Sequence, residues 1–311
     1  MDPAPLPQLR RPFLTDAGLE TDMVFNRGID LPHFASIILL DDGPGREALA
    51  NYFRGFLDLA ERTGRGLILE SATWRGNSDW AEPLGLTLSE LDTLNRSAVE
   101  LLIELKQEYA SRVGSIVVSG CIGPRGDGYD PGTVMSVHAA EEYHLRQAKV
   151  LSSAGAEMLS AITMTNVPEA IGVAGAARAI GAPVAISFTV ETDGRLPTGD
   201  TLEAAIAAVD EATEGYPAYY MINCAHPAHF MPALESGGSW TSRIGGVRAN
   251  ASRCSHAELD AMTELDIGDL VELAALHRDL VERFPRITVL GGCCGTDLRH
   301  VAAIAEACPA G

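Results

Sequence analysis

Three cysteines have the residue type and the neighbours that could build a metal centre. Cys224 follows Asn223 at the end of an apolar segment, and Cys293 and Cys294 stand side by side in Gly-Gly-Cys-Cys-Gly-Thr at 291–296. Zinc binds thiolates tetrahedrally, and catalytic zinc sites use three protein ligands and leave the fourth position open. The three cysteines therefore predict a catalytic zinc ion that activates a thiol, since a metal-held thiolate is nucleophilic at neutral pH.

The glycines around the paired cysteines make such a site sterically feasible. Adjacent residues of a regular strand point to opposite faces, so the backbone must turn for both sulfurs to reach one ion. Gly291, Gly292 and Gly295 permit the unusual backbone angles of that turn. A disulfide between the adjacent Cys293 and Cys294 would be strained. The remaining cysteines, Cys121, Cys254 and Cys308, are expected to be ordinary buried residues.

Apolar runs alternate with longer segments of helical periodicity, which indicates repeated βα units and a parallel sheet. Eight predicted strands and eight predicted helices favour a (β/α)8 barrel with the zinc site at the C-terminal ends of its strands. A doubly wound open sheet is the alternative, but no GxGxxG follows the first strand. Strands are predicted at 12–15, 66–71, 115–119, 157–163, 183–190, 218–223, 243–248 and 287–290, and helices at 47–63, 89–112, 137–153, 167–180, 201–210, 227–234, 267–284 and 298–307.

Composition narrows the class of protein and its partners. The chain has 311 residues, 46% of them hydrophobic, which is enough for one large core, and we expect a single domain over 1–311 with an extended arm at 1–11. The net charge of −19 argues against nucleic-acid binding, and no segment is apolar enough to span a membrane. We expect a cytoplasmic protein with reduced thiols that acts on small molecules, and a homo-oligomer is compatible with the sequence.

Three motifs together resemble a known family of methyltransferases. Gly-Gly-Cys-Cys-Gly-Thr at 291–296, the upstream Asn223-Cys224 pair and Thr-Asp-Ala-Gly at 15–18 are similar to the homocysteine S-methyltransferases, which include betaine–homocysteine and S-methylmethionine–homocysteine enzymes. The resemblance extends over about 14–307. It implies a zinc-dependent TIM barrel that transfers a methyl group from a sulfonium or betaine-type donor, S-methylmethionine-like being favoured, to homocysteine, giving methionine.

By motif position, the resemblance makes Cys224, Cys293 and Cys294 the zinc ligands, and Asp16 a carboxylate that helps to hold the amino group of homocysteine. An Asp at this place could also simply cap a loop. In the family, a glutamate near the end of strand four also binds that amino group, and this sequence lacks it. Ile162 occupies that place and is followed by the matching Thr163, so the acceptor could be held differently or be another thiol.

The loop after the second strand is the other departure, because it carries Trp74 and Arg75 where the family often has smaller polar residues and a tyrosine. Trp74 could form an aromatic wall for a cationic methyl donor or pack within the loop. Arg75 could pair with Glu70, grip a substrate carboxylate, or be a solvated surface residue. Asn250 could bind a substrate carboxylate or cap a turn.

The mechanism implied is displacement of the methyl group by the acceptor thiolate in a dry cavity. A zinc-dependent lyase or hydrolase on the same barrel is the alternative, and it would need Asp16 or His226 as a base. His226 could instead begin a helix, since Pro227 follows it. A zinc or redox sensor is the non-enzymatic alternative, although sensors more often use four protein ligands.

Overall fold

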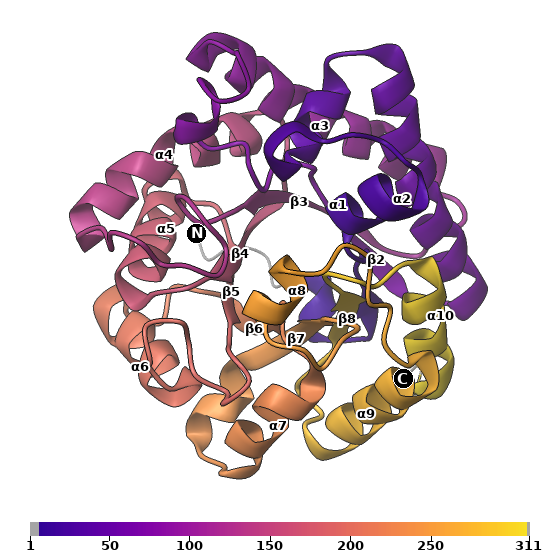
Figure 1. The fold of residues 1–311 in the computed structure, drawn as a ribbon, viewed down its shortest axis with the longest axis vertical. Coiled ribbons are helices and arrows are strands. Elements are labelled where there is room, and N and C mark those ends of the chain that lie inside the picture. The colour runs from indigo at the N-terminus through magenta and orange to yellow at the C-terminus, as the bar shows by residue number, and fades with distance from the viewer. Residues whose placement is uncertain (1–5, 310–311) are drawn as a thin grey trace.

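Eight parallel strands close into one barrel in the computed structural model, which describes residues 6–309 (Figure 1). Each strand pairs with the next along the chain, and the last pairs with the first, so the sheet has no free edge. The strands are β1 (Phe13–Leu14), β2 (Gly66–Glu70), β3 (Ile116–Ile122), β4 (Met158–Met164), β5 (Val184–Thr189), β6 (Tyr219–Asn223), β7 (Ile244–Ala249) and β8 (Val289–Gly292).

Helices surround this barrel and cover the outer face of every strand (Figure 1). Among the described residues, none of the helices is both long enough and apolar enough to cross a lipid bilayer. The α-helices are α1 (Leu19–Thr21), α2 (Gly43–Thr63), α3 (Leu88–Glu108), α4 (Val137–Ser153), α5 (Val167–Ile180), α6 (Leu202–Thr213), α7 (Pro227–Glu235), α8 (His256–Asp260), α9 (Leu270–Arg283) and α10 (Leu298–Ala307), and the shorter turns are η1 (Pro7–Leu9), η2 (Asp22–Asn26), η3 (Pro32–Phe34), η4 (Ser36–Leu40), η5 (Ser78–Trp80) and η6 (Ser239–Arg243).

Strand β2 illustrates how the barrel divides its side chains. Leu67 and Leu69 belong to the outer core, between the sheet and the helices, whereas Ile68 belongs to the inner core with Val117 and Val289. This alternation follows from the two-residue period of a strand, and each fully buried leucine or isoleucine contributes roughly 1.5–3 kcal/mol. By the same alternation, the side chain that follows Ile68 on the inner face belongs to Glu70.

Helix α2 shows how an outer helix positions part of the site. Asp42 caps its N-terminus by accepting a hydrogen bond from Gly45 N, and Gly64 ends it in the left-handed region. These two signals set the length of the helix. They place Tyr52, on its buried face, so that the Tyr52 hydroxyl accepts a 3.1 Å hydrogen bond from the backbone N–H of Ala17, just beyond β1.

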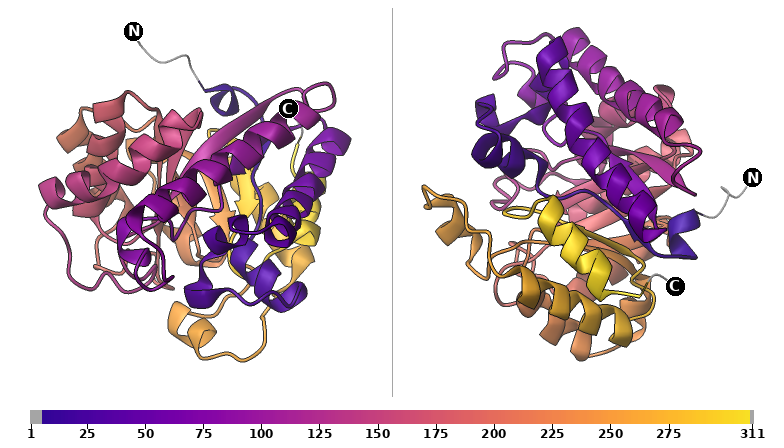
Figure 2. Two further views of the ribbon diagram at one scale, coloured as in Figure 1. Left: turned by 90° about the horizontal axis from the view of Figure 1, so that it is seen from above. Right: turned by 90° about the vertical axis from the view of Figure 1, so that its right-hand side faces the viewer.

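The end of the barrel opposite the strand C-termini is filled by the segment around η1, while α8 lies over the other end (Figure 2). Leu6 joins the inner core, and Gln8 is fully buried beside Met158. The predicted extended arm is therefore wrong at Pro7–Leu9, which form a 3-10 turn at the end of the barrel, because Leu6 and Gln8 are buried inside. Residues 1–5 of the predicted arm lie outside the described residues.

The predicted (β/α)8 barrel is confirmed, and the open-sheet alternative is wrong because β1 pairs with β8. Every predicted strand segment overlaps an observed strand. Helix α8 was not predicted. Its signal is the capping box in which Ser255 and Glu258 bond reciprocally to each other's backbone N–H, a pattern readable from Ser-x-x-Glu.

Candidate metal centre and substrate cavity

Three cysteine sulfurs meet where β6 and β8 end. The Sγ atoms of Cys224, Cys293 and Cys294 all lie within 4.8 Å of one another, and those of Cys224 and Cys294 are 4.0 Å apart. This is the one such group of potential metal ligands among residues 6–309. The predicted convergence of sulfurs from two strands is therefore present in the fold, which brings together residues about 70 positions apart.

Backbone geometry at both strand ends turns the sulfurs toward each other. Cys224 has a positive φ of 51°, an uncommon conformation for a residue with a side chain, and its N–H donates to the Arg248 carbonyl at 3.1 Å. Gly291 lies so close to Thr15 that a Cβ there would overlap the Thr15 hydroxyl. Gly295, with φ 78°, completes the turn after Cys294. The glycines thus serve the turn that the sequence predicts.

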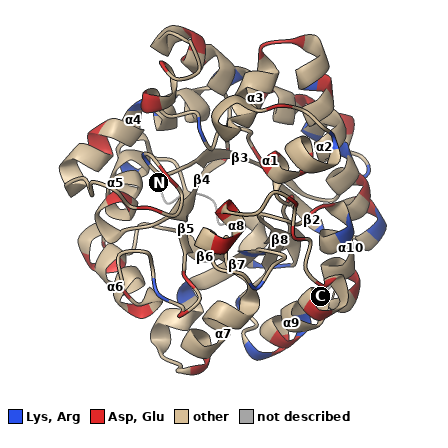
Figure 3. Cartoon of the chain, viewed as in Figure 1, with Lys and Arg blue, Asp and Glu red and all other residues tan. Residues whose placement is uncertain are grey.

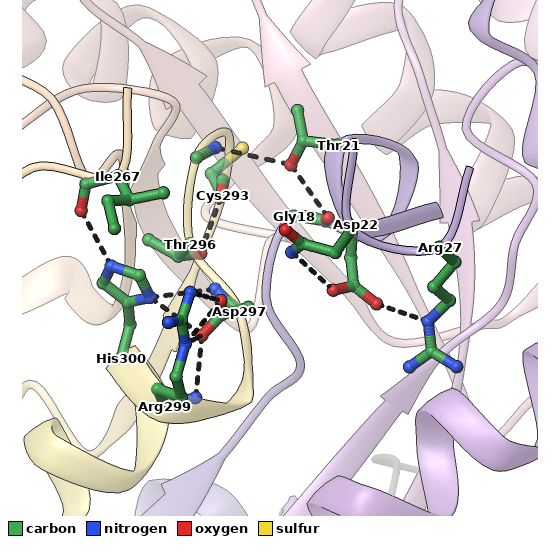
Figure 4. Close-up of polar contacts among 12 residues, drawn as sticks. Gly18, Thr21, Asp22, Arg27, Ile267, Cys293, Thr296, Asp297, Arg299 and His300 are labelled. Atoms are coloured by element: carbon green, nitrogen blue, oxygen red, sulfur yellow. Dashed lines mark hydrogen bonds and ion pairs between the residues drawn. The ribbon is translucent and has the colours of Figure 1, made fainter. Parts of the chain in front are cut away.

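The loop after β8 is braced from two sides, as Figure 4 shows. The hydroxyl of Thr296 donates to the Cys293 carbonyl at 2.6 Å. On the opposite side, the Thr21 hydroxyl donates to Gly18 O at 2.9 Å and accepts from the backbone N–H of Gly295 at 3.4 Å. These bonds fix the position of the paired cysteines before any ligand arrives.

The sulfurs of Cys224 and Cys293 lie next to each other in this structure, with Cα atoms 5.4 Å apart. Converging strand ends bring the two residues this close. That the thiols are reduced stays a prediction. Metal binding requires thiolates, so the form that could hold a metal ion is the reduced one.

Cys294 lies in a setting that disfavours a free thiolate. Burial raises the pKa of its thiol, and the hydroxyl of Tyr129, 3.3 Å from the sulfur, opposes that shift. Tyr129 stacks on His256, with ring centroids 3.9 Å apart, and His256 Nε2 lies 2.6 Å from the Cys224 carbonyl. The sequence gives no signal for Tyr129 or His256, because Tyr129 lies in a loop and His256 begins α8, both distant from the cysteines in sequence.

The donor set fits a soft metal ion. Three cysteine sulfurs, two of them from adjacent residues, approach one point without a carboxylate or imidazole among them. A cation at that point would compensate the burial that disfavours the Cys294 thiolate. The residues present are therefore compatible with a three-sulfur site that leaves further coordination positions to a ligand.

A cavity of about 410 Å³ opens beside the sulfurs, a size suited to a small metabolite. Seven acidic residues but only two arginines line it, and Figure 3 shows acidic segments on α8, over the mouth. Its acidic residues are Asp16, Glu20, Glu70, Asp127, Asp260, Glu264 and Asp266, its arginines are Arg75 and Arg248, and its aromatic and aliphatic lining includes Leu19, Phe25, Phe34, Trp74, Tyr129, Ile162, Leu259, Met262 and Leu265.

Asp16 is paired with a buried arginine that the sequence analysis did not identify. Its Oδ1 lies 2.7 Å from Arg248 Nη2, and both side chains are less than a tenth exposed. Tyr52 donates a 3.2 Å hydrogen bond to Oδ2 of the same carboxylate. Burial raises the pKa of Asp16, and Arg248 opposes this shift. A carboxylate engaged in this way is poorly placed to act as the base that a hydrolase or lyase would need.

Ile162 and Thr163 both line the cavity, as their predicted place at the end of β4 requires. Thr163 has a positive φ of 66°, and Asn223 clamps it from β6. The Asn223 side chain accepts from Thr163 N at 2.9 Å and donates to Thr163 Oγ1 at 2.8 Å. Because Asn223 precedes Cys224, this clamp couples the end of β4 to the sulfur cluster.

Trp74 and Arg75 reach the cavity, but the suggested ion pair between Arg75 and Glu70 is absent among the described contacts. Arg75 instead donates to the carbonyl of His33, and its guanidinium lies 4.3 Å from the ring centroid of Trp80. Trp74 donates to the Ile162 carbonyl at 3.2 Å, which fixes its indole as part of the cavity wall. The ion pair fails because Glu70 points into the barrel.

Asn250 and His226 lie apart from the cavity. Asn250 is buried, its backbone N–H donates to the Ala225 carbonyl at 3.1 Å, and it does not line the cavity. His226 caps α7 by accepting a hydrogen bond from Ala228 N, and burial lowers its pKa to about 4. The interpretation of His226 as the start of a helix is confirmed, and His226 does not line the cavity.

The fold and the site define the chain as a parallel (β/α)8 barrel with a three-cysteine cluster and an acidic cavity at the C-terminal ends of its strands. A model of the homocysteine S-methyltransferase family matches residues 13–308. The chain therefore belongs to the homocysteine S-methyltransferase family.

Individual relatives are distant but span most of the chain. Homocysteine S-methyltransferase 1 of Arabidopsis thaliana is 24% identical, over 71% of this chain and 72% of its own. Selenocysteine Se-methyltransferase of Brassica oleracea var. italica is 24% identical, over 76% and 73%. The metallated form of the homocysteine methyltransferase MmuM of Escherichia coli, 22% identical, matches with a TM-score of 0.75 over 97% and 99% of the chains, which shows a shared fold.

Proposed function

We propose that this protein is a zinc-dependent thiol methyltransferase that moves a methyl group from a sulfonium or betaine-type donor, an S-methylmethionine-like sulfonium being favoured, to homocysteine. The observation that carries the proposal is the cluster of Cys224, Cys293 and Cys294 sulfurs beside an acidic, partly aromatic cavity. Family membership and relatives named for homocysteine and selenocysteine as acceptors support the choice of acceptor.

Cys224, Cys293 and Cys294 are the residues that would hold the zinc ion. When bound by three thiolates, zinc offers one further coordination position and lowers the pKa of a thiol there, so that the thiolate forms at neutral pH. Tyr129, through its hydroxyl 3.3 Å from Cys294 Sγ, helps to fix the cluster from the side of the cavity.

The cavity suits a cationic donor. Seven carboxylate residues against two arginines give the lining an excess of negative charge, which attracts a sulfonium or quaternary ammonium group. Trp74 adds an aromatic surface that contributes roughly 0.5–2 kcal/mol toward a cation near its ring. A simple anion would find few partners here.

The reaction is a displacement at carbon. The acceptor thiol loses its proton to solvent, its sulfur forms a bond to the donor methyl carbon, and the donor's sulfur–methyl bond breaks with its electron pair on the leaving group. A sulfonium donor thus leaves as a neutral thioether. An anion and a cation combine in the transition state, so a cavity that excludes water favours the reaction. The chain holds the two substrates in line with each other, and this alignment provides the larger share of the rate enhancement.

A donor panel tests the proposal. Reduced, zinc-loaded protein is incubated with homocysteine and with S-methylmethionine, dimethylsulfoniopropionate or glycine betaine in turn, and methionine and the demethylated donor are measured by mass spectrometry. We expect methionine with a sulfonium donor, and none when homocysteine is omitted or a zinc chelator is added. Absence of methionine with every donor, or full activity after chelation, would contradict the proposal.

A further inference from the structure

A buried carboxylate without an ion-pair partner faces the cavity from the end of β2. Glu70, the last residue of β2, is 3% exposed and lines the cavity. Neither of its carboxylate oxygens has a hydrogen-bond partner among residues 6–309. Its orientation follows from the strand period, because Ile68, two residues earlier, lies in the inner core.

The neighbours of Glu70 leave it without a positively charged partner. Ser119, its register partner on β3, hydrogen-bonds to Ser160 of β4 at 2.8 Å, and both neutral hydroxyls lie close enough to Glu70 to lower the pKa of its carboxyl. Arg248, the nearest cation, is held by Asp16 at 2.7 Å and by the carbonyls of Ala17 and Gly292, each at 3.2 Å. The guanidinium thus satisfies Asp16 and leaves Glu70 without an ion pair.

A buried carboxylate in this state destabilises the free protein, and burial raises its pKa as expected. A protein retains such a group where a bound ligand supplies the missing partner, because ligand binding then offsets the lower stability of the free protein. The missing partner of Glu70 must donate hydrogen bonds and carry positive charge. A primary ammonium group satisfies both conditions with three N–H donors.

The other carboxylates that could take this role are unsuitable. Asp16 is neutralised by Arg248 and bonded by Tyr52. Ile162, at the end of β4, presents an apolar side chain to the same cavity. Among the cavity's deeply buried carboxylates, Glu70 is therefore the one without an ion-pair partner.

We propose that Glu70 binds the α-ammonium group of the acceptor amino acid and so selects an amino-acid thiol over a simple thiol. This inference rests on the proposed function and adds to it the residue that determines acceptor specificity. Glu70 acts as a binding and positioning residue here, because it holds the backbone end of the acceptor while the thiol end lies toward the cysteines.

The test compares two thiols that differ only in the ammonium group, L-homocysteine and 4-mercaptobutanoate. Binding to reduced, zinc-loaded protein without donor is measured by titration calorimetry, and steady-state rates are measured with the donor that the wild type uses. In Glu70→Gln, which keeps the shape and removes the charge, we expect the affinity for homocysteine to fall at least about tenfold. The affinity for 4-mercaptobutanoate and the KM of the donor should change less than about twofold.

Thermal unfolding separates this role from a structural one. Glu70→Gln should unfold at the same temperature as the wild type or higher, because it removes an unpaired buried charge. Glu306→Gln, the same change on the exposed face of α10, is the matched control and should alter neither binding nor stability. A second variant, Glu70→Gln with Ile162→Glu, returns a carboxylate to the cavity and should recover part of the homocysteine affinity.

The possible results distinguish the two proposals. A wild type that methylates both thiols equally well, or a Glu70→Gln protein that loses affinity for both, retains the methyltransferase function and overturns the role of Glu70. A Glu70→Gln protein that changes only the KM of the donor also overturns it. A wild type that neither binds nor methylates any thiol overturns both proposals together.

Discussion

Two groups of residues at the barrel mouth are built on different principles. In the first, the sulfur side, β6 and β8 bring three sulfurs together through left-handed backbone at Cys224 and a glycine-rich turn around Cys293 and Cys294. In the second, the carboxylate side, β1, β2 and β7 bring together two carboxylates and one arginine, Asp16, Glu70 and Arg248, with β7 running between β6 and β8. The sulfur side depends on backbone geometry, whereas the carboxylate side depends on charge balance.

This difference separates two parts of the site. The sulfurs carry the motif at 291–296 on which the resemblance to the family rests. The carboxylate side has the Asp16–Arg248 pair, and Ile162 on β4 stands where the resemblance implies a further glutamate. We interpret the sulfur side as the part that determines the chemistry, and the carboxylate side as the part that determines which acceptor is held.

Removing one sulfur should have the largest effect. Cys294→Ala leaves two potential ligands, so we expect loss of bound zinc and a fall in kcat/KM of at least about 1,000-fold, equivalent to roughly 4 kcal/mol. Metal analysis and the methionine assay, both under reducing conditions, measure the two effects. Cys254→Ala is the control, since Cys254 does not line the cavity. A Cys294→Ala protein that keeps zinc and activity would remove the functional distinction of the sulfur side.

Removing the arginine should break the carboxylate side instead. Arg248→Met leaves Asp16 buried without its ion-pair partner, so we expect the free energy of unfolding to fall by about 3–5 kcal/mol. Urea unfolding measures the loss. The double variant with Asp16→Asn should recover much of it, because the side chain at position 16 then carries no uncompensated charge. If the single variant stays within about 1 kcal/mol of the wild type, charge balance is not what holds this side together.

His277, a buried histidine away from the barrel mouth, shows how burial of a titratable group affects the free energy of unfolding where no ligand binds. Burial lowers the pKa of His277 to about 4 from an ordinary value of 6.5, and its Nδ1 lies 2.8 Å from the Leu273 carbonyl. Between these pH values the unfolded chain binds the proton and the folded chain does not. The free energy of unfolding should therefore fall by up to about 3 kcal/mol as the pH drops through this window.

His277→Gln keeps a donor for the Leu273 carbonyl but does not titrate. Urea unfolding at pH 7 and at pH 4.5 should show a smaller difference for this variant than for the wild type, by about 2–3 kcal/mol. Activity at pH 7 should not change, in contrast to substitutions at the mouth. An identical pH dependence in the two proteins would show that His277 is not the source of the slope.

The smallest effect is expected from the hydroxyl that touches the sulfur side. Tyr129→Phe removes one contact, 3.3 Å from Cys294 Sγ, and keeps the stacking on His256. A single hydrogen bond contributes about 1 kcal/mol, so kcat/KM should fall by roughly fivefold. Steady-state kinetics measures this fall, and metal analysis checks that the variant keeps its zinc. A loss as large as that of Cys294→Ala would mean that Tyr129 belongs to the essential machinery.

The sequence allowed the barrel and the sulfur cluster to be predicted because both are encoded locally. Strand and helix periods repeat along the chain, and the motif at 291–296 carries its own glycines. The carboxylate side could not be predicted in the same way. Nothing near Arg248 in sequence indicates that it pairs with Asp16, and the position of Tyr129 over Cys294 depends on how a loop folds back. Long-range pairs of this kind emerge only when the barrel closes.

X-ray absorption at the zinc edge tests the central claim most directly. On reduced protein loaded with zinc, we predict three sulfur ligands near 2.3 Å and one lighter ligand, changing to four sulfur ligands when homocysteine is added without donor. That result would place all three cysteines and the acceptor thiol around one ion. A zinc ion with fewer than three sulfur neighbours, or one whose surroundings do not change when homocysteine is added, would contradict the account.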